Sequence, residues 1–401
     1  MDYFWRILVC LFGFINQGFN LYFSLVISYQ LYLDPIPSLL FKMAFNIGGI
    51  LGNIISYHIL HKYGYEKIIY LMYIVSVIGW YFIWICESWQ YYEVLLLIIG
   101  RFVMGVSVGI GFCILPVVLL QSFFPDSSWR YLAFSLPCFM ITVCGGISYF
   151  FAMCFSWQLV AELCLLSSLF ELLVTVNFSG CLDSVHVTDS LLFQLNKQVI
   201  INDSLKKSNT LIYQKISLLL HFFQAYISPD FLLNNAQFIC SNVSNNTLLC
   251  HLNIILLLVI FMGIAMGFIH LIYGVWNLFI NAVLVAMVYM LVYTWNISLF
   301  DQVLIWPSTT LNILMIILCA ACSFGWGQLP YIMLMNNGIV EQALYQYFLY
   351  KCFLSWWISN LIQTIVWHIF IQLWYFHYIS FCLSVICLIA STLPVVDYLV
   401  K

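Results

Sequence analysis

Residues 93–120 read EVLLLIIGRFVMGVSVGIGFCILPVVLL, an apolar run in which Arg101 is the one internal charge. A membrane-spanning helix needs about 20 apolar residues, so this run is long enough to cross a bilayer. It also contains Gly105, Gly109 and Gly111, and small residues at such spacing let neighbouring helices approach closely. The stretch therefore predicts a spanning helix that packs tightly inside a bundle.

The rest of the chain has the same apolar character. Of its 401 residues, 64% are hydrophobic and 7% are charged, whereas soluble domains are about 45–50% apolar and about 25% charged. A soluble globular protein is excluded, and a net charge of −3 offers no basic surface to nucleic acid. We expect a polytopic membrane protein whose surroundings are the lipid bilayer.

Apolar stretches separated by polar clusters predict twelve transmembrane helices. Their expected positions are near residues 6–29, 40–60, 67–87, 93–120, 131–152, 157–177, 211–235, 249–273, 276–298, 309–335, 345–369 and 372–397. We therefore expect an all-α fold of two six-helix bundles, residues 1–177 and 211–401, with a short cytoplasmic linker at 178–210. Tight glycine turns at Gly64 and Gly274 occupy the same place in each half, which indicates that the bundles are pseudo-symmetric.

The distribution of basic residues predicts the orientation in the membrane. With the N-terminus in the cytoplasm, only Lys42 and Arg101 of the twelve Lys and Arg residues lie toward the outside, as the positive-inside rule requires. An even number of helices then places both termini in the cytoplasm. We expect the plasma membrane to be the location.

The expected outer loop between the seventh and eighth helices has two further features. Asn242 and Asn245 begin N-glycosylation sequons there, so the protein is expected to be a glycoprotein. Cys240 and Cys250 flank the same polar stretch and either close a disulfide or remain free. Most of the other cysteines lie in apolar runs, where cysteine packs as a small hydrophobe.

Motifs spread along the chain resemble one transporter family. In the first half they are Gln17-Gly18-Phe19-Asn20, Gly48-Gly49 with Gly52, Lys62 with Gly64, Gly100-Arg101-Phe102 with Gly105 and Gly109, and Pro125 with Arg130. In the second half, residues 325–331 (GWGQLPY) resemble G-P-G-P-I-P-W, and residues 357–362 (WISNLI) resemble W-T-S-N-F-I. The chain is thus similar to the sugar-porter branch of the major facilitator superfamily, and within it to the facilitative glucose transporters.

The resemblance implies the major facilitator fold, alternating-access transport of a small solute, and no cofactor. The substrate-binding positions that it implies are Gln17, Asn20, Gln224, Asp230, Asn234, Asn235, Tyr331, Trp356, Trp357 and Asn360. Its gating positions are Gly64, Arg101, Arg130 and Pro330. The residues themselves support a cavity, because amides inside apolar helices are costly unless they face water, a ligand or one another.

Several of these positions have a second interpretation. Arg101 is either a gating cation or an arginine that snorkels to lipid headgroups. Asp230 follows Pro229, which interrupts the seventh helix, so this carboxylate either lines a cavity or caps a helix end. Glu162 and Glu171 are nine residues apart and point to opposite faces of a helix, so they cannot form one site, and proton coupling by either remains open.

Departures from the family pattern leave the function open between two classes. Cys138 and Trp356 stand where the family has polar sugar contacts, and Gln121 and Asn336 stand where it has acidic residues at the cytoplasmic face. The first class is a facilitated-diffusion carrier of a small solute, a hexose or related sugar included. The second is a transporter-derived sensor or assembly protein. No catalytic or metal-binding motif is present, so we expect no enzyme, and the sequence does not indicate an oligomeric state.

Overall fold

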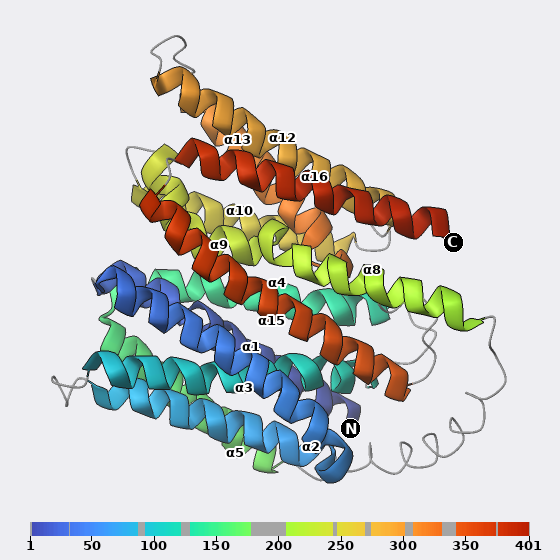
Figure 1. The fold of residues 1–401 in the computed structure, drawn as a ribbon. Coiled ribbons are helices and arrows are strands. Elements are labelled where there is room, and N and C mark those ends of the chain that lie inside the picture. The colour runs from blue at the N-terminus through green and yellow to red at the C-terminus, as the bar shows by residue number, and fades with distance from the viewer. Residues whose placement is uncertain are drawn as a thin grey trace.

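The computed structural model describes residues 2–31, 33–86, 93–121, 129–177, 206–243, 247–268, 274–300, 308–330, 342–373 and 376–400, and the elements in these ranges are all helices (Figure 1). The first half contains α1 (Asp2–Gln30), α2 (Pro35–Ile85), α3 (Glu93–Gln121), α4 (Trp129–Cys154) and α5 (Trp157–Asn177). The second half contains α8 (Lys206–Ile227), α9 (Pro229–Val243), α10 (Thr247–Gly267), α12 (Val275–Phe300), α13 (Ser308–Ala321), the π-helix η3 (Cys322–Trp326), α15 (Gln342–Leu373) and α16 (Phe376–Val400).

These elements form twelve transmembrane segments in the described part of the chain. α2 is two segments, because it holds the candidate spans Pro35–Leu60 and Tyr63–Ile85, whereas α8–α9 and α13–η3 are one segment each. Ten segments are long and apolar enough to cross a membrane by themselves. The remaining two are α13–η3 and the 32-residue α15. The predicted all-α fold with twelve spanning helices is confirmed.

Two residues break the helices where the sequence predicts a change of direction. Gly64 has φ 78° and ψ 171°, a conformation that is accessible almost only to glycine, and it joins the two spans of α2. Pro229 has no backbone N–H to donate, so α8 ends at Ile227 and α9 begins at Pro229 after a bend at Ser228. The seventh spanning segment is therefore discontinuous.

Glycines set the closest helix contact of the first half, between α2 and α3. A Cβ added at Gly105 would lie 2.1 Å from the Phe45 carbonyl oxygen, and one at Gly109 would lie 2.2 Å from the Gly49 carbonyl oxygen. Gly48 meets α3 in the same way, because its added Cβ would lie 2.1 Å from the Phe102 oxygen. The two backbones touch directly, as small residues at a helix crossing permit.

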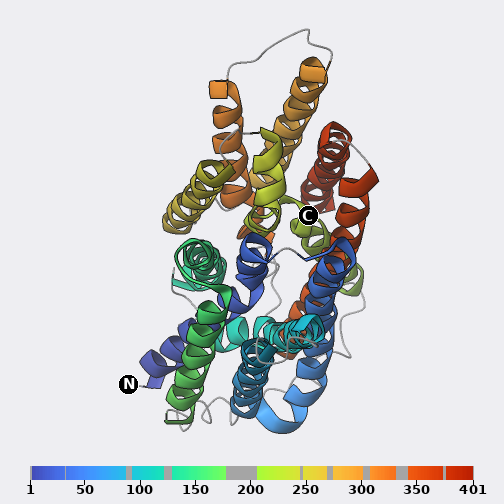
Figure 2. The same ribbon diagram turned by 90° about the vertical axis from the view of Figure 1, so that its left-hand side faces the viewer.

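The helices of the two halves gather on opposite sides of the molecule, with α15 lying against α2 and α10 against α4 (Figure 2). Large apolar side chains remain exposed on outer faces, for example Leu166, Phe170 and Leu173 of α5, which are 56–61% exposed. Such an apolar exterior suits contact with lipid rather than water. Of the expected linker at 178–210, residues 178–205 lie outside the described residues, and α8 begins at Lys206, earlier than residue 211.

Candidate functional site

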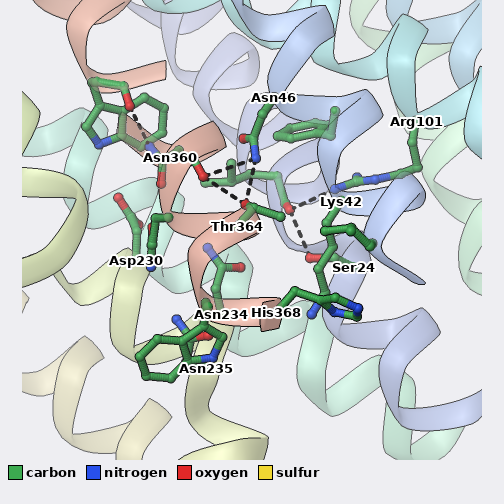
Figure 3. Close-up of a pocket in the computed structure, with 16 residues that line it drawn as sticks. Ser24, Lys42, Asn46, Arg101, Asp230, Asn234, Asn235, Asn360, Thr364 and His368 are labelled. Atoms are coloured by element: carbon green, nitrogen blue, oxygen red, sulfur yellow. Dashed lines mark hydrogen bonds between the residues drawn. The ribbon is translucent and has the colours of Figure 1, made fainter. Parts of the chain in front are cut away.

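A cavity lies between the two bundles and takes its walls from both of them (Figure 3). Its volume is about 110 Å³, well above the roughly 10–15 Å³ that a single water needs. The lining residues are Leu21, Ser24, Leu39, Lys42, Phe45, Asn46 and Arg101 from α1, α2 and α3, and Asp230, Asn234, Asn235, Trp356, Asn360, Gln363, Thr364, Trp367 and His368 from α9 and α15. Polar side chains therefore face one another across the bundle interface.

Hydrogen bonds connect the bundles directly at this cavity. The Asn46 amide donates to the Thr364 hydroxyl at 2.9 Å and to the Asn360 carbonyl oxygen at 3.5 Å (Figure 3). The Tyr22 hydroxyl of α1 donates to a carboxylate oxygen of Asp230 on α9. These contacts join α1 and α2 of the first half to α9 and α15 of the second.

The helix break at Pro229 positions Asp230. Asp230 stands in the first turn of α9, where the backbone N–H groups have no partner within the helix and favour a negative charge. Its side chain lines the cavity and accepts the Tyr22 hydrogen bond. Of the two interpretations of Asp230, the position on the cavity wall and the hydrogen bond from Tyr22 agree with the first, in which the carboxylate lines a cavity.

Arg101 is held inside the protein rather than at its surface. Its side chain is 1% exposed, its guanidinium donates to the Asn20 and Leu21 carbonyl oxygens at 2.5 and 3.5 Å, and it lies 4.0 Å from the centre of the Phe45 ring. A face-on aromatic ring attracts a cation. Snorkelling to headgroups does not describe this arginine, which forms part of the cavity wall.

Aromatic rings close the bundle interface on one side of the cavity. Trp357 is fully buried and packs on Phe45 and Phe112, and an added Cβ at Gly49 would lie 2.5 Å from its ring. Nearer the start of α15, Tyr350 stacks on Tyr57 of α2 with ring centres 4.4 Å apart. Trp357 is thus one of the aromatic rings that close the interface and does not line the cavity, whereas its neighbour Trp356 does.

Three of the expected substrate-binding amides lie elsewhere. Asn20 is buried in a network inside the first bundle, where its amide donates to Asn16 at 2.7 Å and to Ser76 at 3.0 Å. Gln17 packs against Gly111 of α3. Gln224 donates to the Trp326 carbonyl oxygen at 2.9 Å, and so joins α8 to the end of η3. None of the three lines the cavity.

The network in the first bundle also contains a buried carboxyl group. Glu171 is 1% exposed and accepts hydrogen bonds from Asn16 at 2.8 Å and from Ser167 at 3.1 Å. Glu162 is exposed on the other face of α5, as the nine-residue spacing predicts. Neither glutamate lines the cavity.

The remaining candidates are gating positions and one aromatic residue. Gly64 forms the turn inside α2, and Pro330 is buried just after η3. Arg130 belongs to α4, but its side chain lies outside the described part of the structure, as does the whole of Tyr331.

Sequence reasoning missed several cavity residues that a helical pattern could have identified. Lys42 and Asn46 are four residues apart on α2, and Asn360, Gln363 and Thr364 are three and four apart on α15. Residues at these spacings share one helix face. A polar face on an otherwise apolar helix is therefore the signal for this wall.

Comparison with known proteins agrees with this architecture. Residues 17–178 match the family described as Sugar (and other) transporter. No curated protein sequence matches the chain significantly. The whole chain has the major facilitator fold, and its first half carries the sugar-transporter family pattern. The predicted resemblance to the sugar-porter branch is confirmed over residues 17–178.

Solved structures match over nearly the full length. The proton:xylose symporter XylE bound to 6-bromo-6-deoxy-D-glucose is 15% identical with a TM-score of 0.73, and the alignment covers 97% of this chain and 94% of that one. A partially occluded inward-open form of XylE from E. coli is 16% identical, with a TM-score of 0.71 and 98% coverage of both chains. The POT family transporter PepTSo is 11% identical, with a TM-score of 0.71 over 98% and 97% of the two chains. At these identities the likeness is one of fold.

Proposed function

We propose that this protein carries a small hydroxylated solute, a hexose or related sugar, across the membrane by facilitated diffusion. The observation that carries the proposal is the polar cavity whose walls come from both bundles. In transporters built from two repeats, the substrate site lies between the repeats, and rocking of one against the other exposes it to each side in turn.

The lining chemistry supports a solute with several hydroxyl groups. Asn234, Asn235, Asn360 and Gln363 present amides to the cavity, and an amide can both donate and accept hydrogen bonds. A buried hydroxyl left unpaired costs about 1–3 kcal/mol, so convergent amides favour a polyhydroxylated molecule. The ring of Trp356 adds an apolar wall against which a sugar face can pack.

The contacts between the bundles are weak enough to break and re-form during a conformational change. A neutral hydrogen bond such as Asn46 to Thr364 contributes about 0.5–1.5 kcal/mol, and one to a charged group, such as Tyr22 to Asp230, about 1.5–3 kcal/mol. A conformational change of a few kcal/mol can be driven by a ligand that prefers one state. Within the described residues, the gating positions that we propose are Arg101 on the cavity wall, the turn at Gly64, and Pro330.

A disulfide supports the predicted orientation. Cys240 at the end of α9 is bonded to Cys250 at the start of α10, and structural disulfides persist in oxidising compartments outside the cytosol. The sequons at Asn242 and Asn245 lie between these cysteines. We propose that this connection faces the outside of the plasma membrane and that both termini are cytoplasmic.

The second candidate is a transporter-derived sensor or assembly protein. Neutral Gln121 and Asn336 in place of the family's acidic residues favour it, because a weakened cytoplasmic latch would impair the return of the carrier. A sensor would keep the cavity and bind a solute without moving it.

Uptake into proteoliposomes separates the two candidates. We expect the purified full chain to equilibrate one or more neutral or charged monosaccharide derivatives across the membrane. Asn360→Ala should slow uptake, because this amide faces the cavity, whereas Ile362→Ala on the exposed side of the same helix should not. Saturable binding without uptake for every solute of such a panel would favour the sensor.

A further inference from the structure

The charged groups on the cavity wall are not balanced. Lys42 and Arg101 contribute two positive charges and Asp230 contributes one negative charge, so the formal sum is +1 with His368 neutral. A charge in a membrane interior is costly and normally has a partner of opposite sign. The wall therefore leaves a place for one negative charge.

The single carboxylate does not neutralise either cation. Asp230 accepts a hydrogen bond from the hydroxyl of Tyr22. The guanidinium of Arg101 contacts two backbone carbonyl oxygens and the ring of Phe45. Carbonyl oxygens and a ring face orient a cation but supply no net negative charge. Among the described residues, Lys42 forms no ion pair or hydrogen bond and remains exposed where it lines the cavity.

The positive groups lie together on one part of the wall. Lys42 is one helical turn before Asn46 on α2, and Arg101 is on the neighbouring α3 (Figure 3). The neutral ring of His368 lies beside them, on the facing end of α15. The amides of Asn234 and Asn360 lie on the wall that the second bundle contributes to the cavity. One part of the wall thus suits an anionic group and the other suits hydroxyl groups.

We propose that the solute is a hydroxylated organic monoanion, such as a monosaccharide that carries one carboxylate. Its carboxylate binds beside Lys42 and Arg101, and its hydroxyls bind the amides of α9 and α15. This inference rests on the proposed function, since it assigns the solute class to the same cavity. A charge-assisted hydrogen bond is roughly twice as strong as a neutral one, so the anion is selected over a neutral sugar of the same size.

The test compares D-glucuronate with D-glucose, which differ at one carbon by a carboxylate in place of a hydroxymethyl group. We expect wild-type proteoliposomes to take up labelled D-glucuronate about tenfold faster than D-glucose. Lys42→Met should reduce that preference at least about fivefold, and Lys42→Arg should retain most of it. Lys351→Met is the matched control, because Lys351 lies on α15 against the Tyr347 ring and outside the cavity, and it should leave the preference unchanged.

Two readouts keep this inference separate from the proposed function. Equal uptake of both sugars, unaffected by Lys42→Met, would overturn the anion inference and leave the carrier proposal standing. If the wild type moves neither solute, thermal stabilisation of the purified protein decides. Stabilisation by D-glucuronate that Lys42→Met abolishes upholds the inference without transport, and no stabilisation by D-glucuronate overturns it.

Discussion

Replacing Gly105 by alanine should destabilise the first bundle without changing what the cavity binds. The new Cβ would lie 2.1 Å from the Phe45 carbonyl oxygen, 2.9 Å from the Phe45 carbonyl carbon and 3.1 Å from the Gly49 nitrogen. All three atoms belong to the backbone of α2, so no side-chain rotation relieves the contact. Real Cβ atoms essentially never approach closer than 3.0 Å, and α2 and α3 must therefore separate by about 1 Å.

Overpacking of this kind costs typically about 1–3 kcal/mol. The assay is thermal unfolding of the detergent-solubilised protein together with the yield of monodisperse protein, and Gly105→Leu should be worse than Gly105→Ala in both. Gly267→Ala is the control, because nothing lies within 4 Å of its added Cβ. A Gly105→Ala protein with the wild-type melting temperature and yield, but with altered solute selectivity, would show that Gly105 is not a packing position.

Three further predictions concern the turn in α2, the buried network and the membrane orientation. Gly64→Ala should lower the free energy of unfolding by about 1–3 kcal/mol, because φ 78° with ψ 171° is strained for alanine; unchanged thermal melting would contradict this. Asn16→Ala should also lower stability by about 1–3 kcal/mol, because Glu171 and Asn20 lose a partner, while the affinity for a transported solute stays the same; a changed affinity with normal stability would place the network in the solute site. Added outside intact cells, a thiol reagent should label Cys240 and Cys250 only after reduction, and glycan should occur only at Asn242 or Asn245; a glycan at Asn202 would reverse the orientation.

The sequence was sufficient for the helices because most spans carry their own hydropathy signal. Length and hydropathy identify the run that becomes α3, and Gly105 and Gly109 mark the crossing with α2 that the structure contains. Pro229 likewise marks the break between α8 and α9, because the missing N–H acts locally.

The cavity was less predictable because apolar helices give little indication of which face meets which neighbour. Asn20 and Asp230 both carry polar groups inside spanning segments, yet Asn20 is satisfied by Asn16 and Ser76 within one bundle, whereas Asp230 faces the other bundle. Both arrangements avoid an unpaired buried group, so composition does not distinguish them. Lys42 and Thr364 lie outside the motifs of the resemblance, and only the juxtaposition of α2 with α15 shows that they share a wall.

Transport by this fold requires the two bundles to move relative to each other around the cavity, and a cross-link between the bundles would prevent that movement. Asn46 and Thr364 are the best-placed pair, since their side-chain atoms meet at 2.9 Å from opposite bundles. The double variant Asn46→Cys/Thr364→Cys is treated with a short bifunctional thiol reagent, and solute exchange by proteoliposomes is compared with the wild type and both single variants under the same treatment. We expect exchange to stop in the cross-linked double variant, to continue in the three controls and to return on cleavage of the link. A wild-type rate of exchange by protein whose cross-link is verified by mass spectrometry would show that this movement is not needed.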